Sequence, residues 1–178
     1  MTDLERRSRG SQAGHINPTV PPSRGQVLVA VDFSVADLVG LRAACRTTLD
    51  ATGLDPDRAL MFVFAINEGL VNAVLHGGGS GRLTLLTNGR FLVAEIADRG
   101  PGTTRTIPTS LPPDDAESGR GLWAAQRAVD RISLTSGPDG TRLRLEVVYR
   151  WVNGYPFAGS PHDASLGRQI AATLFEDS

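Results

Sequence analysis

The sequence contains no lysine, although 18 of its 178 residues are basic, so every one of these 18 is an arginine. This absence excludes a Walker A lysine, the lysine that protein kinases place on the phosphates, and any Schiff-base lysine. The 18 basic and 19 acidic side chains give a formal net charge of -1, which provides no excess positive charge to hold a polyanion. We therefore expect no direct nucleic-acid partner.

Cysteine and long apolar runs are also scarce. Cys45 is the single cysteine, which excludes an internal disulfide and a zinc site of the Cys/His type. No stretch approaches the roughly 18 consecutive apolar residues of a membrane span, and the N-terminal MTDLERRSRGSQAG lacks the apolar region of a signal peptide. These absences predict a cytoplasmic protein with no membrane partner.

The length and composition are typical of one domain with flanking segments. Residues 1–25 are rich in Arg, Ser, Gly and Pro and poor in apolar side chains, which predicts a flexible arm. Residues 26–150 carry the patterns of the expected domain, and residues 151–178 form a C-terminal extension. The extension carries three apolar residues at helical spacing: Leu166, Ile170 and Leu174. They predict a short helix that packs on the domain itself or, as the alternative, binds a partner.

Hydrophobic periodicity predicts a strand and two helices in the first half of the domain. Residues 26–33, QVLVAVDF, form a β-branched run that is typical of a strand. Ser34 and Asp37 can cap a helix that follows it. Asp55 followed by Pro56 marks the start of a second helix. The apolar stripe of this second helix comprises Phe62, Val63, Ile66, Leu70 and Val74.

The second half of the domain contains two predicted hairpins, a long loop and a third helix. RLTLLT and RFLVAEIAD are strands joined by Asn88-Gly89, a strong signal for a two-residue hairpin. Residues 103–118 lack periodicity, and a loop of this length in a compact domain is usually functional, so we expect a lid that nucleotide orders. The third helix begins near Gly119. Its apolar positions are Leu122, Ala125, Val129 and Ile132.

RISLTS and TRLRLEVVY close the domain as a second hairpin. In the last strand the side chains alternate cleanly, with Leu143, Leu145, Val147 and Tyr149 on one face and Arg142, Arg144 and Glu146 on the other. The order strand, helix, helix, hairpin, lid, helix, hairpin predicts an α+β fold. We expect a two-layer sandwich whose mixed, mostly antiparallel sheet carries the helices on one face.

Three polar residues share one face of the second predicted helix. Glu68 and Asn72 are four residues apart, and His76 follows one turn later. A carboxylate can take a proton, and an amide oxygen is a suitable ligand for a hard cation. Taken alone, this spacing more often marks a solvated polar face.

A second candidate follows a predicted strand, where Asp98 precedes Gly100 and Gly102. The carboxylate can accept hydrogen bonds from a ligand amine, and glycine backbone allows a ligand to approach closely. The alternative is an ordinary Asp-Gly turn at the end of a strand.

The remaining candidates lie at the start of two further elements. Backbone N–H groups at the start of the third helix can bind an anion, and this start reads Gly119-Arg120-Gly121-Leu122. The alternative is a helix start that needs glycine for backbone reasons. Thr141, after Gly140, begins the last strand, where its hydroxyl can bind a ligand or merely favour the strand.

In their order and spacing these motifs resemble the GHKL ATPases, the group of gyrase, heat-shock protein 90, histidine kinases and MutL. The resemblance covers about residues 26–150. Within that group, the compact size and the phrase INEGLVNAVLHG are most similar to the anti-sigma-factor serine kinases (RsbW-like) of Gram-positive bacteria. The resemblance implies the Bergerat ATP-binding sandwich with ATP and Mg²⁺ as cofactors.

The resemblance also implies roles for individual residues. Asn72 would bind the magnesium that bridges the phosphates, Glu68 would be the general base, and Asp98 would receive the adenine amino group. The other nucleotide-binding positions that it implies are His76, Gly100, Gly102, Gly119, Gly121, Leu122 and Thr141. Because the chain has no lysine, arginine must help to meet the charge of the transferring phosphoryl group, and we select Arg120.

The expected function is that of an ATP-dependent protein-serine kinase that sequesters a sigma factor and phosphorylates a serine of a small antagonist protein. The sigma factor and this anti-anti-sigma antagonist are the expected partners, with a homodimer as a further alternative. The main alternative function is a nucleotide-gated module that holds a partner without phosphotransfer. A third is the catalytic half of a histidine kinase, which we rank last because too few residues precede the first strand for a phosphoacceptor hairpin.

Overall fold

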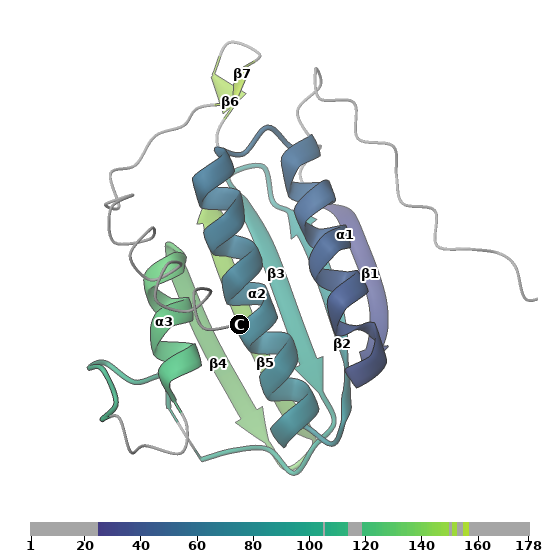
Figure 1. Cartoon of the computed structure of the whole chain (residues 1–178), viewed down its shortest axis with the longest axis vertical. Coiled ribbons are helices and arrows are strands. Elements are labelled where there is room, and N and C mark those ends of the chain that lie inside the picture. The colour runs from purple at the N-terminus through teal and green to yellow at the C-terminus, as the bar shows by residue number, and fades with distance from the viewer. Residues whose placement is uncertain (1–24, 105, 114–118, 150, 153–154, 157–178) are drawn as a thin grey trace, which may run out of the picture.

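The computed structural model describes residues 25–104, 106–113, 119–149, 151–152 and 155–156 (Figure 1). The expected arm and the expected helix of the C-terminal extension lie outside the described residues, as does part of the expected lid. The elements in chain order are β1 (Gln26–Ser34), the 3-10 turn η1 (Val35–Asp37), α1 (Leu38–Ala51), α2 (Pro56–His76), β2 (Ser80–Thr87), β3 (Phe91–Asp98), α3 (Arg120–Ala128), β4 (Arg131–Gly137), β5 (Gly140–Val148), β6 (Trp151–Val152) and β7 (Tyr155–Pro156).

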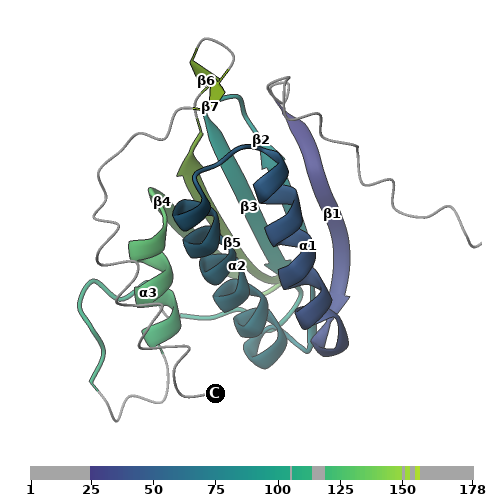
Figure 2. The same cartoon turned by 45° about the horizontal axis from the view of Figure 1, so that its top comes forward.

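One five-stranded sheet organises the fold. Its strand order is β1-β2-β3-β5-β4, and each of these neighbouring pairs is antiparallel. Helices α1, α2 and α3 lie side by side on one face of the sheet (Figures 1 and 2). The predicted α+β two-layer sandwich is therefore confirmed, and the described sheet contains no parallel pair. β6 and β7 form a separate short hairpin.

The core lies between the sheet and the helices. Leu143, Leu145 and Val147 of β5 point into it and are at most 5% exposed, whereas Arg144 and Glu146 lie on the opposite face. On that opposite face Arg144 Nε donates to Glu146 Oε1 at 2.7 Å. The predicted alternation of this strand is thus confirmed. Burying an aliphatic side chain of this size stabilises a fold by about 1.5–3 kcal/mol, so one apolar face is enough to attach the strand.

Helix α2 is more apolar than expected from the sequence, which predicts no stretch that could span a membrane. The helix has 21 residues and contains an 18-residue window with a mean hydropathy of 1.5, so by length and composition alone it could cross a membrane, although half of that window is buried inside the protein. This corrects the expectation that no stretch has that character. The helix contacts α1, α3 and three strands of the sheet, so it is covered on several sides and needs apolar residues around most of its circumference. Its buried residues include Phe62, Phe64, Ile66 and Leu70.

The predicted helix starts are present. Pro56 is the first residue of α2, and the Asp55 Oδ1 atom accepts a hydrogen bond from Arg58 N at 3.1 Å. At the earlier start, Ser34 N donates to Asp37 Oδ2 at 2.9 Å. The first turn there is the 3-10 turn η1, and α1 begins only after it. Local capping residues therefore mark both points at which the chain passes into the helical layer.

The first predicted hairpin forms with a longer loop than expected. Residues 88–90 separate β2 from β3, so the loop has three residues where the Asn-Gly signal predicts two. Asn88 Oδ1 accepts hydrogen bonds from the backbone N atoms of Arg90 and Phe91 at 3.1 and 2.8 Å. Gly89 adopts a φ of 84°. The asparagine side chain thus closes the turn by bonding to backbone two and three residues ahead.

Helix α3 ends earlier than its apolar spacing predicts. The last helical residue is Ala128, Val129 has extended backbone, and Ile132 lies in β4. Both Val129 and Ile132 still pack at the core. A helix and a strand that face the same core both require apolar residues, so the helical spacing continues by coincidence across the boundary.

Candidate nucleotide-binding site

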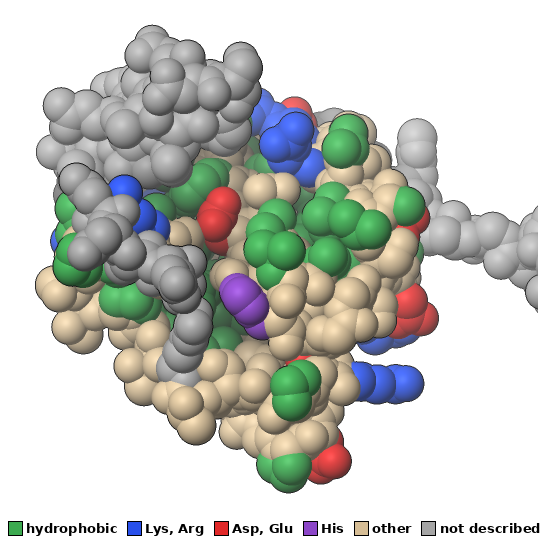
Figure 3. All heavy atoms as spheres, turned by 60° about the horizontal axis from the view of Figure 1, so that its bottom comes forward, with side chains coloured by type: hydrophobic (Ala, Val, Ile, Leu, Met, Phe, Trp, Pro, Cys, Tyr) green, Lys and Arg blue, Asp and Glu red, His purple; other side chains and the backbone are tan. Residues whose placement is uncertain are grey.

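The segments that carry the candidate residues meet at one end of the sandwich. The C-terminal half of α2, the end of β3, the start of α3 and the start of β5 all lie at the lower end of Figure 1. Figure 3 looks onto this end, where acidic and histidine side chains lie among apolar ones. The site has two parts, which we call the base side, around Asp98, and the phosphate side, around Glu68.

Asp98 is the centre of the base side. Its Oδ1 atom accepts hydrogen bonds from Gly100 N at 2.9 Å and from Thr141 N at 3.0 Å. Two backbone donors on one oxygen hold the half-buried carboxylate in a single orientation. The second oxygen, Oδ2, accepts no hydrogen bond from the described part of the chain. The arrangement therefore leaves one fixed acceptor for a ligand donor.

Close packing explains the glycine two residues after Asp98. A Cβ atom added to Gly100 would lie 2.6 Å from the Cα atom of Gly77, and one added to Gly77 would lie 2.4 Å from Asp98 Cγ. Real Cβ atoms do not approach this closely, so both positions require glycine. The end of α2 thus lies directly against the Asp98 turn. Gly100 is needed here for contact within the protein, a reason that the sequence pattern did not supply.

The turn between β4 and β5 closes the base side from the other direction. Gly102 has a φ of 75°, and a Cβ atom there would lie 2.1 Å from the carbonyl oxygen of Gly137. Gly140 has a φ of 127°, and its added Cβ atom would lie 2.1 Å from the carbonyl oxygen of Asp98. Because both glycines also adopt the left-handed region, any side chain at either one is strained.

The phosphate side is built on Glu68. A Cβ atom added to Gly121 would lie 2.0 Å from Glu68 Oε2, so the start of α3 sits directly over the carboxylate. Glu68 is half-buried, and burial raises the pKa of its carboxyl group above the ordinary value. The polar face of α2 is therefore not a solvated face at this position. It is covered by the start of α3, whose sequence predicts an anion site.

The other residues of α2 and α3 vary in exposure. Asn72 is half-buried one turn beyond Glu68, and His76, the last residue of α2, is exposed. Gly119 caps α3 with a φ of 103°, and its carbonyl oxygen accepts a hydrogen bond from Trp123 N at 3.0 Å. Leu122 packs against the core. Leu122 thus has a structural role in holding the helix start in place.

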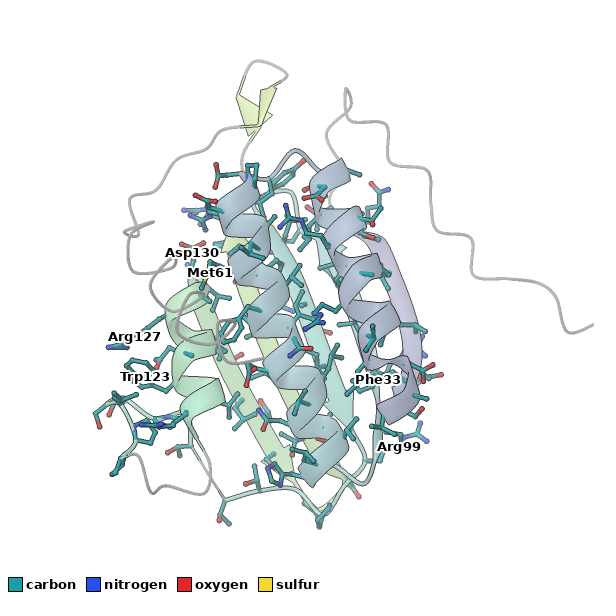
Figure 4. The ribbon with its side chains drawn as sticks, in the orientation of Figure 1. Phe33, Met61, Arg99, Trp123, Arg127 and Asp130 are labelled. Atoms are coloured by element: carbon teal, nitrogen blue, oxygen red, sulfur yellow. The ribbon has the colours of Figure 1, made fainter. Side chains whose placement is uncertain are left out.

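Arg120 lies against the loop that precedes α3. Its side chain is exposed, and its Nε atom donates to the carbonyl oxygen of Pro112 at 3.5 Å. Further along the outer side of the helix, the Arg127 guanidinium lies 4.1 Å from the ring centroid of Trp123 (Figure 4). Arg120 is therefore directed toward the loop, whereas Arg127 packs on a side chain of its own helix.

The donor set of the site fits a cation that keeps most of its water. Among the described residues, no group of three or more His, Cys, Asp or Glu side chains could hold a metal ion. Mg²⁺ bound together with a nucleotide needs only one or two protein oxygens, because phosphates and water complete its octahedron. The Asn72 amide, half-buried one helical turn beyond Glu68, supplies an oxygen of the required kind.

Two residues of the site were missed by sequence reasoning. Gly77, the residue that follows α2, packs against Asp98. Ser136, near the end of β4, accepts a hydrogen bond from Thr103 N at 2.7 Å through its Oγ atom, which also lies 3.1 Å from Thr141 Oγ1. The Gly77-Gly78-Gly79 run was a signal for the first. No local signal marks Ser136, since its partners come from other segments.

Fold and site together define an α+β sandwich with a polar site at one end. The sequence profile of the histidine kinase-like ATPase domain matches residues 31–147, which is more than half of the chain. The chain belongs to this family. The superfamily expectation is thereby confirmed, and ATP binding is the property that the family implies. No curated protein matches the sequence significantly.

Solved structures align with the chain at low sequence identity. The RsbU and RsbW domains of Rv1364c from Mycobacterium tuberculosis align with a TM-score of 0.50 and 22% identity over 68% of this chain and 32% of that one. The chain thus spans about a third of that structure's length. Lower scores, 0.40 and 0.41, belong to the histidine kinase domain of the Erythrobacter litoralis EL346 blue-light activated histidine kinase and to the Acinetobacter baumannii histidine kinase AdeS. These two have 16% and 15% identity and cover 72% and 67% of this chain, or 70% and 67% of their own.

Proposed function

We propose that the protein is a Mg²⁺-dependent, ATP-using protein-serine kinase that also acts as an anti-sigma factor in partner switching. One observation carries the proposal. The start of α3, which offers backbone N–H groups to an anion, lies in direct contact with the half-buried carboxylate of Glu68. A phosphate-binding helix start beside a carboxylate is the arrangement that phosphoryl transfer to a hydroxyl requires.

In the proposed reaction the base side orients the nucleotide. Asp98 Oδ2 accepts a hydrogen bond from the amino group of adenine, while Gly100 and Thr141 hold Oδ1 in place. Because this carboxylate is already fixed by two backbone donors, little conformational entropy is lost when the base binds. The triphosphate then extends toward α3.

On the phosphate side, Glu68 takes the proton of the serine hydroxyl as its oxygen attacks the γ-phosphorus. The bond between this phosphorus and the β-γ bridging oxygen breaks, and ADP leaves with the electron pair. Burial raises the pKa of the Glu68 carboxyl group toward neutral pH, and a general base is most effective when its pKa lies near the working pH. The backbone N–H groups at Gly121 and the Arg120 guanidinium meet the charge of the phosphoryl group. Mg²⁺ held at Asn72 would supply further positive charge on the phosphates.

A nucleotide-gated binding module remains the second candidate function. It is favoured by the position of Arg120, whose Nε atom donates to Pro112 O on the loop. Phosphotransfer through Arg120 requires this contact to be exchanged for one with the nucleotide. A module that only binds ATP and a partner needs no such exchange.

The proposed partners are a sigma factor and a small anti-anti-sigma antagonist that carries the acceptor serine, and the proposed location is the cytoplasm. A homodimer is compatible with the same function. The support for these partners is the INEGLVNAVLHG phrase in α2 and the RsbW domain named in the Mycobacterium tuberculosis structure.

The test separates binding from chemistry. Transfer of radiolabel from ATP to a candidate antagonist is measured beside equilibrium ATP binding for wild type, Glu68→Ala and Asn72→Ala. Glu68→Ala should keep ATP affinity near wild type and lose about a hundred- to ten-thousand-fold in transfer, as expected for a positioned base. Asn72→Ala should lose Mg²⁺-dependent binding and transfer together. Asn67→Ala, on the side of α2 that faces α1, is the matched control and should change neither.

Three results would contradict parts of this proposal. Calorimetry that detects no Mg²⁺-dependent heat at millimolar ATP removes the nucleotide function altogether. A wild-type protein that binds antagonists but phosphorylates none supports the binding module. Wild-type transfer by Glu68→Ala shows that another group is the base.

A further inference from the structure

A chain of three hydrogen-bonding groups runs along the base side. The backbone N atom of Thr103, where the loop begins, donates to Ser136 Oγ at 2.7 Å. Ser136 Oγ lies 3.1 Å from Thr141 Oγ1, and Thr141 N donates to Asp98 Oδ1 at 3.0 Å. Ser136 thus connects the start of the loop with the residue beside the fixed carboxylate.

Either of the two hydroxyl groups can be the donor in the contact between Ser136 and Thr141, and counting hydrogens favours one direction. Ser136 Oγ already accepts from Thr103 N, and its own hydrogen has Thr141 Oγ1 as the acceptor within reach in the described part of the chain. If Thr141 donated to Ser136, the hydrogen of the half-buried Ser136 hydroxyl would lack a protein acceptor. Donation from Ser136 to Thr141 gives the hydrogen of Ser136 an acceptor within the protein and leaves the hydrogen of Thr141 to donate elsewhere, so we infer this direction.

When Ser136 donates to Thr141, Asp98 and its neighbour Thr141 offer a ligand opposite hydrogen-bonding roles. Asp98 Oδ2 is an acceptor, and the neighbouring Thr141 hydroxyl is a donor. The Watson–Crick edge of adenine presents an amino donor beside a ring-nitrogen acceptor, which matches this pair. Guanine presents a carbonyl acceptor beside an N–H donor and meets the pair with both functions reversed.

We propose that Ser136 is a specificity-determining residue, which selects adenine over guanine by fixing the direction of the Thr141 hydroxyl. Ser136 does this as a positioning residue, without contact to the base. The proposal rests on the nucleotide function proposed above and adds to it the residue that sets the base preference. Without the Ser136 hydroxyl, Thr141 can rotate and accept as well as donate, so guanine is rejected less strongly.

The experiment compares the dissociation constants of Mg-ATP and Mg-GTP by calorimetry in the full chain. Ser136→Ala should reduce the preference for ATP over GTP by about tenfold, the worth of one hydrogen bond. Ser136→Thr keeps a hydroxyl group and should restore most of the preference. Ser133→Ala makes the same chemical change at an exposed position of β4 and should leave the preference unchanged. Amide hydrogen exchange without nucleotide should be faster at Thr103 in Ser136→Ala only.

The outcomes separate this inference from the proposed function. If wild type binds ATP but Ser136→Ala weakens ATP and GTP equally, Ser136 has only a structural role and the inference is wrong. An unchanged preference in Ser136→Ala overturns it as well. If wild type binds neither nucleotide, the proposed function fails, and the specificity assignment fails with it.

Discussion

The two sides of the site are held together in different ways. On the base side, the Asp98 carboxylate and the Ser136 hydroxyl join β3, β4, β5 and the start of the loop through hydrogen bonds of 2.7–3.1 Å. On the phosphate side, the start of α3 meets α2 at a glycine that touches Glu68. The far end of α3 is better anchored, since Asp130 pairs with Arg58 and accepts from Val148 N at 2.6 Å.

This difference indicates how the work is divided. The base side is preorganised by neighbouring strands whose register already places Asp98 beside Thr141. The phosphate side depends on where one helix end lies, and a helix end next to a loop can shift with little loss of packing. We therefore expect changes on the base side to act on stability and affinity, and changes on the phosphate side to act on chemistry.

The largest effect should come from a glycine of the base side. Gly102→Ala places a methyl group 2.1 Å from Gly137 O at a φ of 75° and should lower the free energy of unfolding by about 2–4 kcal/mol. Gly119→Ala, at a φ of 103°, meets only ring carbons of Pro108 at 3.3 Å and Pro112 at 3.6 Å and should cost about 1 kcal/mol. Chemical denaturation measures both. Equal losses would show that the two sides are equally rigid.

Substitution of a glycine on the phosphate side should reduce phosphotransfer strongly and stability only slightly. Gly121→Ala displaces the flexible end of the Glu68 side chain, so phosphotransfer should fall about a hundredfold, as expected for a base misplaced by about 1 Å. Stability should stay within about 1 kcal/mol of wild type, because alanine favours a helix. Gly40→Ala in α1, where an added Cβ atom has open space, is the matched control in both assays. A Gly121→Ala protein that unfolds but transfers normally would reverse the comparison.

Asp98→Asn tests recognition on the base side. Asparagine keeps one oxygen and replaces the other by an amide donor. In one orientation this donor faces the adenine amino group, and in the other it faces the backbone N–H groups of Gly100 and Thr141. ATP affinity should fall at least about tenfold, as measured by calorimetry. Asp139→Asn, an exposed position of the β4–β5 turn, should bind ATP as wild type does.

The smallest effect concerns the pH dependence of stability on the phosphate side. Burial raises the folded-state pKa of Glu68 above its unfolded value, so ionisation of Glu68 opposes folding, and this penalty grows as pH rises through the raised pKa. The difference in melting temperature between Glu68→Gln and wild type should therefore shift in favour of Glu68→Gln as pH rises from 4 to 8.

Asp37 provides a control of opposite sign for that measurement. Hydrogen bonds from the backbone and hydroxyl of Ser34 lower the pKa of Asp37, so its contribution to stability is present above the unfolded pKa and is lost as pH falls. Asp37→Asn should be less stable than wild type near pH 7, and the two should converge in acid. For Glu68→Gln, a melting temperature that falls relative to wild type as pH rises would contradict the effect that we assign to burial of Glu68.

Much of the fold could be predicted because its signals are local. The cap at Asp55 with Pro56, the Asn88 turn and the alternation of β5 each depend on residues within a few positions of one another. The errors were local as well. The hairpin loop has one residue more than expected, and α3 ends at Ala128 although its apolar spacing continues into the predicted RISLTS strand, because apolar spacing cannot separate two elements that face one core.

By itself, the sequence determined the order of the elements, the α+β class and the identity of the motif residues, since capping, periodicity and spacing are written along the chain. Only the tertiary structure decided which of these residues touch. The contact of Gly121 with Glu68, the packing of Gly77 on Asp98 and the bond from Thr141 N to Asp98 Oδ1, between residues 43 positions apart, depend on how the helices settle on the sheet. That packing is a property of the whole core, because each close approach is set by side chains drawn from every layer.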